Sequence, residues 1–436
     1  MDTICVIGLG YVGLPTAIVA AQSGYKVIGF DIDKKRVALV NQGTPPIHEP
    51  ELKERLSDVL ELGRFYATDQ LPQADCFIIA VPTPLSAHDA ADLTYVFSAT
   101  DIITTQLKVG DLIVLESTVP VGTTELIAKM VSQKTGLVVG KDIFVAHCPE
   151  RVWPSKVFHE IIHNDRVVGG ITPHCTERAT QIYEIFVRGS ITQKNARFAE
   201  LIKLVENSSI DVSVALAHQV AVLAEENGLD PYELIELANK HPRVKIWTPT
   251  CGVGGHCVAV DPWFLIQAYP HKTRLLQAAR LTNDERPSQV IRHITEIIHN
   301  WQAKNSETIS NVLLLGTAYK ANVDDMRESP ALEIAQLLTR DNLEKKEAKY
   351  WVCDPLVNQE KLESLLPTEC VISLDEGLKK ADIIVLLVAH EHFKNIETAN
   401  RTILNFSGLQ LHHCLETTLA SCSLMHFQKA AQQLTK

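Results

Sequence analysis

The chain has 436 residues, of which 46% are hydrophobic and 21% are charged, and its formal net charge is −11. This length exceeds what one hydrophobic core supports, so two or three domains are expected. The acidic balance argues against a nucleic-acid or anionic-membrane surface, and no apolar run is long enough to cross a bilayer. The ten cysteines are scattered and include no C-x-x-C pair. Their spacing therefore predicts no zinc site and no disulfide framework. With no basic leader before the first strand, a cytoplasmic protein is expected.

The chain opens with an apolar strand at 3–8 that runs into G-x-G-x-x-G, formed by Gly8, Gly10 and Gly13. A helix-compatible stretch and a second strand at 26–31 follow. The first glycine allows a tight turn, the second lets backbone approach a pyrophosphate, and the third permits close helix packing. The order of strand, glycines, helix and strand therefore predicts a dinucleotide-binding domain.

The second strand ends in Asp31, about twenty residues beyond the glycines, where a carboxylate binds the ribose 2′-OH and repels a 2′-phosphate. This position favours NAD over NADP. Arg36 lies nearby and could accommodate a phosphate, but a solvated helix charge over the adenine is the preferred interpretation.

The next segments keep the alternation of strands and helices. Strands are expected at 75–81, 111–116 and 143–147, and helices between them, for example at 93–107 and 123–133. This alternation is typical of a parallel, doubly wound sheet.

The character of the sequence changes near residue 197. Residues 197–228 predict one long helix that ends at Asn227-Gly228, and 229–239 predict a short one. A second long helix is expected over 273–303, with Pro287 as a possible kink. Long helices of this kind favour a homodimer, although they could equally be buried within one chain.

From about residue 308 the opening pattern recurs. Residues 311–316 again form a strand that meets a glycine, 350–354 end in an aspartate, and 381–388 mirror 74–81. The fold class is therefore α/β, with two Rossmann-like doubly wound domains joined by a central helical domain. The second half lacks G-x-G-x-x-G, so a second dinucleotide is not expected there. The predicted domains are 1–196, 197–305 and 306–436.

A glycine-dense run at 251–264 places the thiol of Cys257 four residues before the carboxylate of Asp261. A lone cysteine near glycines is more often a small buried hydrophobe. The dinucleotide motif, however, predicts a redox cofactor that could act together with the thiol. A thiol beside polar groups can act as a nucleophile. The combination indicates an oxidoreductase.

Eight motifs in order carry a family resemblance: GLGYVGLP, AVPTP, ESTVPVGTT, CPERV, ELIKLVENS, HPRV, GVGGHCVAVDPWF and GTAYKANVDDMRESPA. From residue 3 to about 395 the chain resembles the UDP-glucose/UDP-N-acetylhexosamine 6-dehydrogenases, most closely the UDP-N-acetyl-D-mannosamine branch. The resemblance implies oxidation of the sugar C6 alcohol to a carboxylate with two NAD+, giving UDP-N-acetyl-D-mannosaminuronate for surface polysaccharide.

The resemblance also implies roles for catalytic residues. Cys257 would add to the C6 aldehyde and form a thiohemiacetal, and a second oxidation would leave a thioester for hydrolysis. Lys203 would be the acid/base and oxyanion partner, with Asn207 one helical turn away on the same face. Glu150 would handle protons and water, and Thr118 would lie near the nicotinamide and the catalytic water. His256 and Asp261 are close to Cys257 in the sequence, which indicates either that they tune or orient the thiol or that they are structural.

The binding residues follow from the same motifs, and no metal ligands are expected. The cofactor contacts are Gly8, Gly10, Tyr11, Val12, Gly13, Asp31, Arg36, Thr83 and Thr118. The nucleotide-sugar contacts are Arg151, Val152, Lys203, Asn207, His241, Arg243, Gly254, Tyr319, Lys320 and Arg327. In this family an arginine near the glycine loop can come from the neighbouring subunit, and the sequence leaves open whether Arg243 does so.

Two departures from the family pattern stand out. Ile210 stands where the mannosamine branch carries an arginine. The last forty residues also diverge, because 402–407 and Leu411-His412-His413-Cys414 replace the usual apolar strand and basic tail. The alternatives are a UDP-N-acetyl-D-glucosamine or UDP-glucose 6-dehydrogenase, a single-step dehydrogenase of the β-hydroxyacid type, and a non-catalytic nucleotide sensor.

Overall fold

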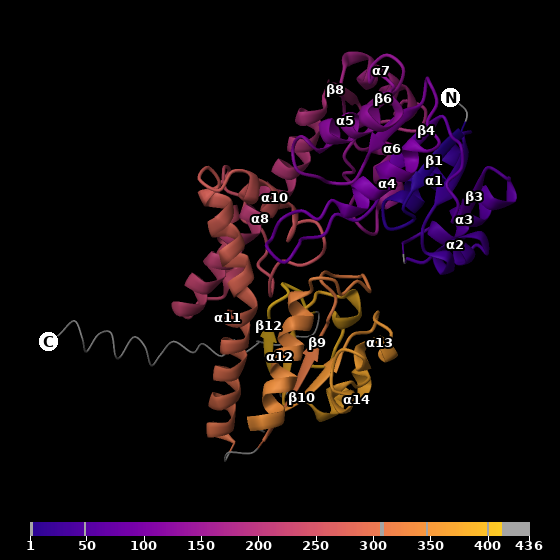
Figure 1. Ribbon diagram of the computed structural model, residues 1–436. Helices are drawn as coiled ribbons and strands as arrows, with labels where there is room; N and C mark the ends of the chain where they lie inside the picture. Colours follow the sequence, from indigo (N-terminus) through magenta and orange to yellow (C-terminus); the bar gives the residue numbers. More distant parts are fainter. Residues whose placement is uncertain (1–2, 48, 306–308, 346–347, 399–400, 412–436) are drawn as a thin grey trace. The chain divides into compact units, whose positions relative to one another are not determined.

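The computed structural model describes residues 3–47, 49–305, 309–345, 348–398 and 401–411 (Figure 1). The chain folds into two compact units. One consists of the residues up to Asn207 together with Trp263–Pro270, and the other consists of Ser208–Pro262 and the residues from His271 onward. Each unit is built around its own sheet, which positions its share of the functional residues.

The sheet of the first unit has eight strands among the described residues, in the order β3-β2-β1-β4-β5-β6-β7-β8. Neighbouring strands are parallel except for the antiparallel pair β6 and β7. The strands are β1 (Thr3–Ile7), β2 (Lys26–Phe30), β3 (Phe65–Thr68), β4 (Cys76–Ile79), β5 (Leu112–Leu115), β6 (Phe144–His147), β7 (Arg166–Gly170) and β8 (Ile191–Asn195).

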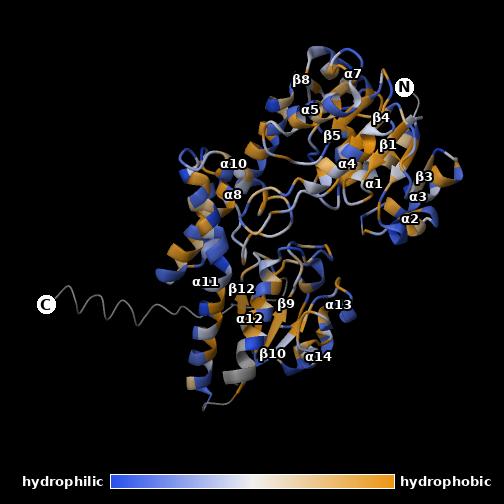
Figure 2. Cartoon of the chain, viewed as in Figure 1, coloured by the Kyte–Doolittle hydropathy of each residue, from blue (hydrophilic) through white to orange (hydrophobic). Residues whose placement is uncertain are grey.

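Helices enclose this sheet. They are α1 (Gly13–Gln22), α2 (Lys34–Asn41), α3 (Leu52–Glu61), α4 (Thr94–Thr104), α5 (Thr123–Thr135), α6 (Val157–His163) and α7 (Pro173–Tyr183). Side chains of successive β1 residues enter two separate apolar clusters, one on each face of the sheet. Strands buried on both faces are continuously hydrophobic, as the orange colour of β1, β4 and β5 in Figure 2 shows.

Four helices follow, two of them long: α8 (Ala196–Glu226), α9 (Pro231–Asn239), α10 (Asp261–Ala268) and α11 (Arg274–Lys304). Helix α8 ends where the sequence predicts, because Gly228 adopts the left-handed conformation at φ 67° that closes a helix. Pro287 lies inside α11 and is buried.

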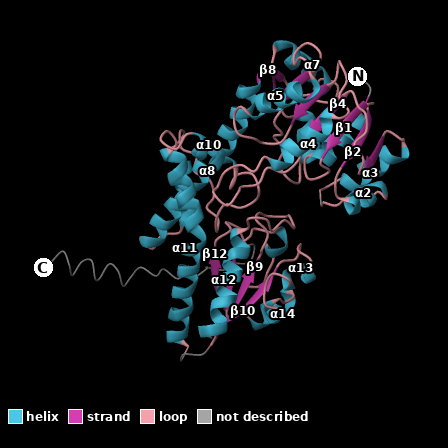
Figure 3. Cartoon of the chain, in the orientation of Figure 1, coloured by secondary structure: helices cyan, strands magenta, loops and turns pink. Residues whose placement is uncertain are grey.

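The second unit contains a four-stranded parallel sheet in the order β10-β9-β11-β12 (Figure 3). Its elements are β9 (Ser310–Leu315), α12 (Pro330–Lys345), β10 (Ala348–Cys353), α13 (Gln359–Glu363), η1 (Thr368–Cys370), α14 (Leu374–Lys380), β11 (Ile383–Leu386), η2 (Glu391–Phe393) and β12 (Thr402–Asn405). Gly316 follows β9 at φ 96° as Gly8 follows β1 at φ 93°. The predicted pair of Rossmann-like domains with a helical domain between them is confirmed.

The sequence analysis did not predict four of the described strands: β3, β7, β8 and β12. Strand β8 is polar and exposed at the sheet edge, and β7 begins with an arginine and ends in two glycines, so neither has a clear strand pattern. The strands predicted for the first sheet pair in parallel, as expected, and β7, which was not predicted, pairs antiparallel with β6. The divergent segment from residue 402 still forms a strand, β12, which pairs with β11.

The structure bears only partly on the expectations about the C-terminal tail, membrane-spanning segments and domain boundaries. Residues 412–436, which include most of the divergent tail, lie outside the described residues. In the described ranges no helix combines the length and apolar character needed to cross a membrane. The boundaries 1–196, 197–305 and 306–436 stay a prediction.

Candidate active site

The glycine turn after β1 forms a cradle that fits a dinucleotide. A Cβ atom on Gly13 would lie 1.9 Å from the Gly8 carbonyl oxygen, and one on Gly8 would lie 2.6 Å from that of Ala80. A Cβ on Gly10 would meet nothing within 4 Å. The first and third glycines are therefore required by packing within the protein, whereas the second faces open space at the start of α1, where a pyrophosphate would approach the backbone.

This contrast gives a testable pair of variants. Gly10→Ala should fold normally but bind NADH roughly tenfold more weakly, because the added methyl group occupies the space needed by the phosphates. Gly13→Ala should instead lower the melting temperature, because backbone atoms must move apart. Fluorescence titration with NADH and thermal unfolding measure the two effects. Unchanged NADH affinity in Gly10→Ala would exclude this glycine from the phosphate site.

Asp31 supports the glycine turn from the end of β2. Its carboxylate accepts hydrogen bonds from the backbone N–H of Leu9 at 2.9 Å and of Asp33 at 2.9 Å. The Arg36 guanidinium also contacts it at 3.0 Å. The Arg36 side chain is 38% exposed on α2 and forms an ion pair with the predicted ribose carboxylate, and its role as a solvated helix charge stays a prediction.

The loops after β4 and β5 join beside the glycine turn. The Thr83 hydroxyl donates to the backbone carbonyl of Thr118 at 2.8 Å, and the Ser117 hydroxyl donates to that of Val81 at 2.7 Å. Thr83 and Thr118 are both half-buried, as are Tyr11 and Val12 at the start of α1. These polar groups lie at the carboxyl ends of adjacent parallel strands, where doubly wound sheets bind their ligands.

Glu150 follows β6 and has an unusual environment. Burial raises its pKa to about 7, although the positive charges of Lys203 and Arg166 and the Val152 N–H oppose the shift. Its Oε1 atom is buried and has no hydrogen-bond partner among the described residues. A carboxyl group with a pKa near neutrality can both take up and release a proton during turnover.

Lys203 and Asn207 lie on one face of α8, and their exposed fractions are 8% and 6%. A lysine on a helix is usually a solvated charge, but the apolar neighbours and the motif around Lys203 predict a site residue, and the side chain is buried. The Lys203 charge acts on Glu150 and lowers the pKa of that carboxyl. An ammonium group, an amide and a carboxyl are thus brought into one part of the first unit.

Arg151, a predicted substrate contact, is engaged within the protein. Its Nε donates to Glu206 at 3.1 Å, and its Nη1 donates to the backbone carbonyl of Asp165 at 2.8 Å. A second bond to Glu206 makes the pair bidentate. Binding a substrate anion through Arg151 would require sharing or releasing Glu206.

Sequence reasoning missed a buried polar cluster behind Glu150. Glu116 accepts hydrogen bonds from the Tyr183 hydroxyl at 2.8 Å and the Thr16 hydroxyl at 3.3 Å. The Arg166 guanidinium lies 5.5 Å from the Tyr183 ring centroid, and its charge reaches both Glu116 and Glu150. The ESTVPVGTT motif drew attention to this region, but no sequence signal indicated Arg166, because it lies on an unpredicted strand.

In the second unit, Cys257 is half-buried, and its Sγ lies 3.1 Å from Nδ1 of the neighbouring His256. The backbone carbonyl of Cys257 accepts from the N–H of Asp261 at 2.8 Å, which fixes the thiol one turn before α10. An imidazole at this distance can take the thiol proton and generate the more nucleophilic thiolate.

The glycines before Cys257 pack on the loop after β9. A Cβ on Gly254 would lie 2.4 Å from the Glu328 carbonyl oxygen, and one on Gly255 would lie 2.7 Å from the Tyr319 ring. The Gly255 N–H donates to the Arg327 carbonyl at 3.2 Å. The Cys257 loop therefore lies directly against the loop that carries the predicted substrate residues.

The remaining predicted substrate residues are distributed over this unit. Tyr319 and Lys320 are half-buried, and Arg327 forms an ion pair with Asp325. His241 and Arg243 are exposed on the segment after α9, where the Arg243 N–H donates to His241 Nδ1 at 3.4 Å.

Three family models match consecutive parts of the chain, all from the UDP-glucose/GDP-mannose dehydrogenase family. The NAD binding domain matches residues 2–187, the central domain 197–285 and the UDP binding domain 313–406. The chain belongs to this family. It is an NAD-dependent nucleotide-sugar 6-dehydrogenase, and its cofactor is NAD.

Individual relatives cover nearly the whole chain. It is 42% identical to the UDP-N-acetyl-D-mannosamine dehydrogenase of Escherichia coli, over 91% of this chain and 96% of that protein. It is 41% identical to an NDP-N-acetyl-D-galactosaminuronic acid dehydrogenase of Ralstonia nicotianae, over 93% and 96%. Among solved structures, a UDP-D-ManNAc dehydrogenase from Pyrococcus horikoshii has 36% identity and a TM-score of 0.85, covering 95% of this chain and 98% of its own.

Proposed function

We propose that the enzyme oxidises UDP-N-acetyl-D-mannosamine to UDP-N-acetyl-D-mannosaminuronate in two steps through a covalent bond to Cys257. The observation that carries the proposal is the half-buried thiol beside His256, in a chain whose first domain holds a dinucleotide cradle. Relatives named as UDP-N-acetyl-D-mannosamine dehydrogenases at 40–42% identity support the choice of sugar. The proposed use of the product is surface polysaccharide synthesis.

The proposed mechanism uses a few groups in succession. NAD+, when bound, accepts one hydride in each oxidation. Lys203 stabilises the C6 oxygen as the alcohol becomes an aldehyde, with Asn207 beside it. The Cys257 thiolate then forms a C–S bond to C6, and the oxygen takes a proton to give a thiohemiacetal. Loss of a hydride from C6 and of the hydroxyl proton leaves a thioester.

Hydrolysis completes the reaction. A water molecule transfers a proton to Glu150 and adds to the thioester carbonyl, and the C–S bond then breaks. The products are the C6 carboxylate and the regenerated Cys257 thiolate. The pKa of about 7 suits Glu150 to this step, because the carboxylate form needed to accept the proton is populated near neutral pH. Thr118 would position the water.

We further propose a homodimer in the reducing environment of the cytoplasm. Three apolar side chains on α8, Phe198, Leu201 and Val205, are 41–50% exposed and lie three to four residues apart, as one helix stripe would require. Arg243 is exposed, as it would have to be in the single chain to serve a neighbouring subunit. Eight free cysteines among the described residues support a reducing compartment.

A substrate panel tests the sugar and the number of oxidations together. UDP-ManNAc, UDP-GlcNAc, UDP-GalNAc and UDP-glucose are each incubated with NAD+, and NADH is counted per sugar consumed. The expected result is two NADH per sugar and the highest kcat/KM with UDP-ManNAc. One NADH per sugar would support a single-step dehydrogenase of the β-hydroxyacid type.

A second candidate substrate has specific support. The relative named as an NDP-N-acetyl-D-galactosaminuronic acid dehydrogenase is 41% identical to this chain. Ile210, which stands at a place where the mannosamine branch carries an arginine, is compatible with a different sugar. Preference for UDP-GalNAc in the panel would overturn the proposed sugar while leaving the covalent mechanism intact.

A further inference from the structure

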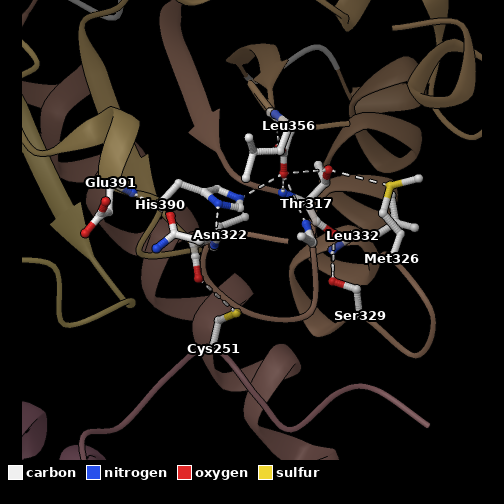
Figure 4. A network of polar contacts seen from close by, with 12 residues as sticks. Cys251, Thr317, Asn322, Met326, Ser329, Leu332, Leu356, His390 and Glu391 are labelled. Carbon is white, nitrogen blue, oxygen red and sulfur yellow. Dashed lines mark hydrogen bonds and ion pairs between the residues drawn. The ribbon is translucent and has the colours of Figure 1, made fainter. Parts of the chain in front are cut away.

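A buried histidine outside the family motifs holds the loop that connects β9 to α12. His390 follows β11, and its side chain is fully buried together with that of Asp354. Its Nε2 lies 3.2 Å from Asp354 Oδ2, and its Nδ1 lies 2.9 Å from the backbone nitrogen of Asn322 (Figure 4). The Asn322 side chain accepts in return from the Glu391 N–H at 3.0 Å. Two reciprocal bonds thus clasp the tip of the loop to the residues after β11.

The hydrogen-bond partners fix the tautomer of His390. A backbone N–H can only donate, so the Nδ1 atom that faces Asn322 must be the acceptor. The proton of the neutral ring is then on Nε2, which donates to the Asp354 carboxylate. Both ring nitrogens are therefore used, and each bond requires a different chemical property of the side chain.

Asp354 is the counterpart of Asp31, since each follows the second strand of its Rossmann-like domain. Its Oδ2 also accepts from the N–H groups of Thr317 at 2.7 Å and Ala318 at 3.1 Å, and its Oδ1 accepts from the N–H of Leu356 at 3.0 Å. In this half of the chain the carboxylate therefore fixes the protein's own loop and has His390 as its further partner.

The two hydrogen bonds act on a loop that carries predicted substrate residues. Asn322 has φ 60°, in the left-handed region that asparagine adopts more readily than most other non-glycine residues. The loop around it carries Tyr319, Lys320 and Arg327, and the Arg327 carbonyl accepts from the Gly255 N–H of the Cys257 loop. A shift at Asn322 would therefore reach both the predicted UDP-sugar contacts and the thiol loop.

We propose that His390 is a positioning residue for nucleotide-sugar binding, acting through its acceptor bond to Asn322. This inference rests on the proposed function only in the identity of the sugar, because UDP alone can report on the loop. The chain provides the basis for a matched pair of substitutions. In His390→Asn the amide oxygen replaces Nδ1 and can still accept from Asn322, whereas in His390→Gln the amide nitrogen replaces Nε2 and can still donate only to Asp354.

The test compares the two variants by calorimetric titration with UDP and by kinetics with the best sugar of the panel. His390→Gln should raise the UDP Kd and the UDP-sugar KM roughly tenfold, because the Asn322 N–H loses its buried partner. His390→Asn should restore both values to within about threefold of wild type. The NADH Kd, which depends on the other unit, should stay unchanged in both variants.

If His390→Gln fails to fold, Asn322→Gly tests whether the bonds between this loop and the residues after β11 support UDP binding, and an unchanged UDP Kd in that variant would overturn the inference. Asn322→Gly retains the positive φ and the N–H but removes the side-chain acceptor for Glu391, on an exposed residue. It should raise the UDP Kd about threefold without lowering NADH affinity. Wild-type UDP affinity in His390→Gln, or equal losses in His390→Asn and His390→Gln, would overturn the inference. A wild-type enzyme that binds UDP but fails to oxidise UDP-ManNAc would count against the proposed substrate alone.

Discussion

Cys257→Ser is expected to lower the rate of uronate formation by roughly a thousandfold while leaving NADH affinity unchanged. A serine hydroxyl is a far weaker acid than a thiol, so His256 at 3.1 Å cannot generate a comparable nucleophile. The cofactor cradle belongs to the other compact unit and does not contain this residue. Absorbance of NADH and chromatography of the sugar product measure the two quantities.

Mass spectrometry of the wild-type enzyme stalled during turnover provides a direct view of the same step. The Cys257 peptide should carry a sugar-derived adduct, and the corresponding peptide of Cys257→Ser should not. Cys370→Ser is the matched control, because Cys370 is also half-buried but lies in η1. Full uronate production by Cys257→Ser, or the absence of any adduct on Cys257, would rule out the covalent scheme.

Glu150→Gln is expected to lower kcat between a hundredfold and a thousandfold and to change its pH dependence. Burial raises the pKa of Glu150 to about 7, so the carboxylate that accepts a proton from water appears only as the pH rises through neutrality. Wild-type kcat should therefore increase with a midpoint near pH 7. The variant cannot ionise at this position, so its kcat should not show this rise with pH.

The same pKa shift has a consequence for stability. Because the fold favours the protonated form of Glu150, its favourable contribution is present in acid and is lost as the pH rises through about 7. Glu150→Gln should thus gain thermal stability relative to wild type between pH 5 and pH 8. Glu177→Gln, an exposed substitution on α7, should show neither effect. If kcat of Glu150→Gln still rises with a midpoint near pH 7, the ionising group is another residue.

The fold could be predicted largely from local sequence patterns. A buried parallel strand is a run of apolar residues, and β1, β4, β5 and β6 have this pattern, so they were found within one or two residues of their bounds. Strands β3, β7, β8 and β12 are short, polar or interrupted by glycine, and they pair only because a neighbouring strand offers free backbone groups. Their existence depends on the sheet more than on their own residues.

The site divides in the same way. The glycine turn could be predicted from spacing, because its residues are close together in the chain, whereas the covalent role of Cys257 beside His256 is what the family resemblance implies. The engagement of Arg151 by Glu206 could not be predicted, because it depends on which surface α8 presents to the rest of the first unit.

The sequence by itself determined the glycine turn of the nucleotide cradle and the order of the domains, because each follows from patterns along the chain, and it predicts Cys257 as the nucleophile. Tertiary structure alone decided how these groups behave. The pKa of Glu150 depends on its burial and on the charges of Lys203 and Arg166, and the clasp of His390 on Asn322 joins residues 68 positions apart. Desolvation and long-range hydrogen bonds exist only after distant segments have packed together, so no local pattern encodes them.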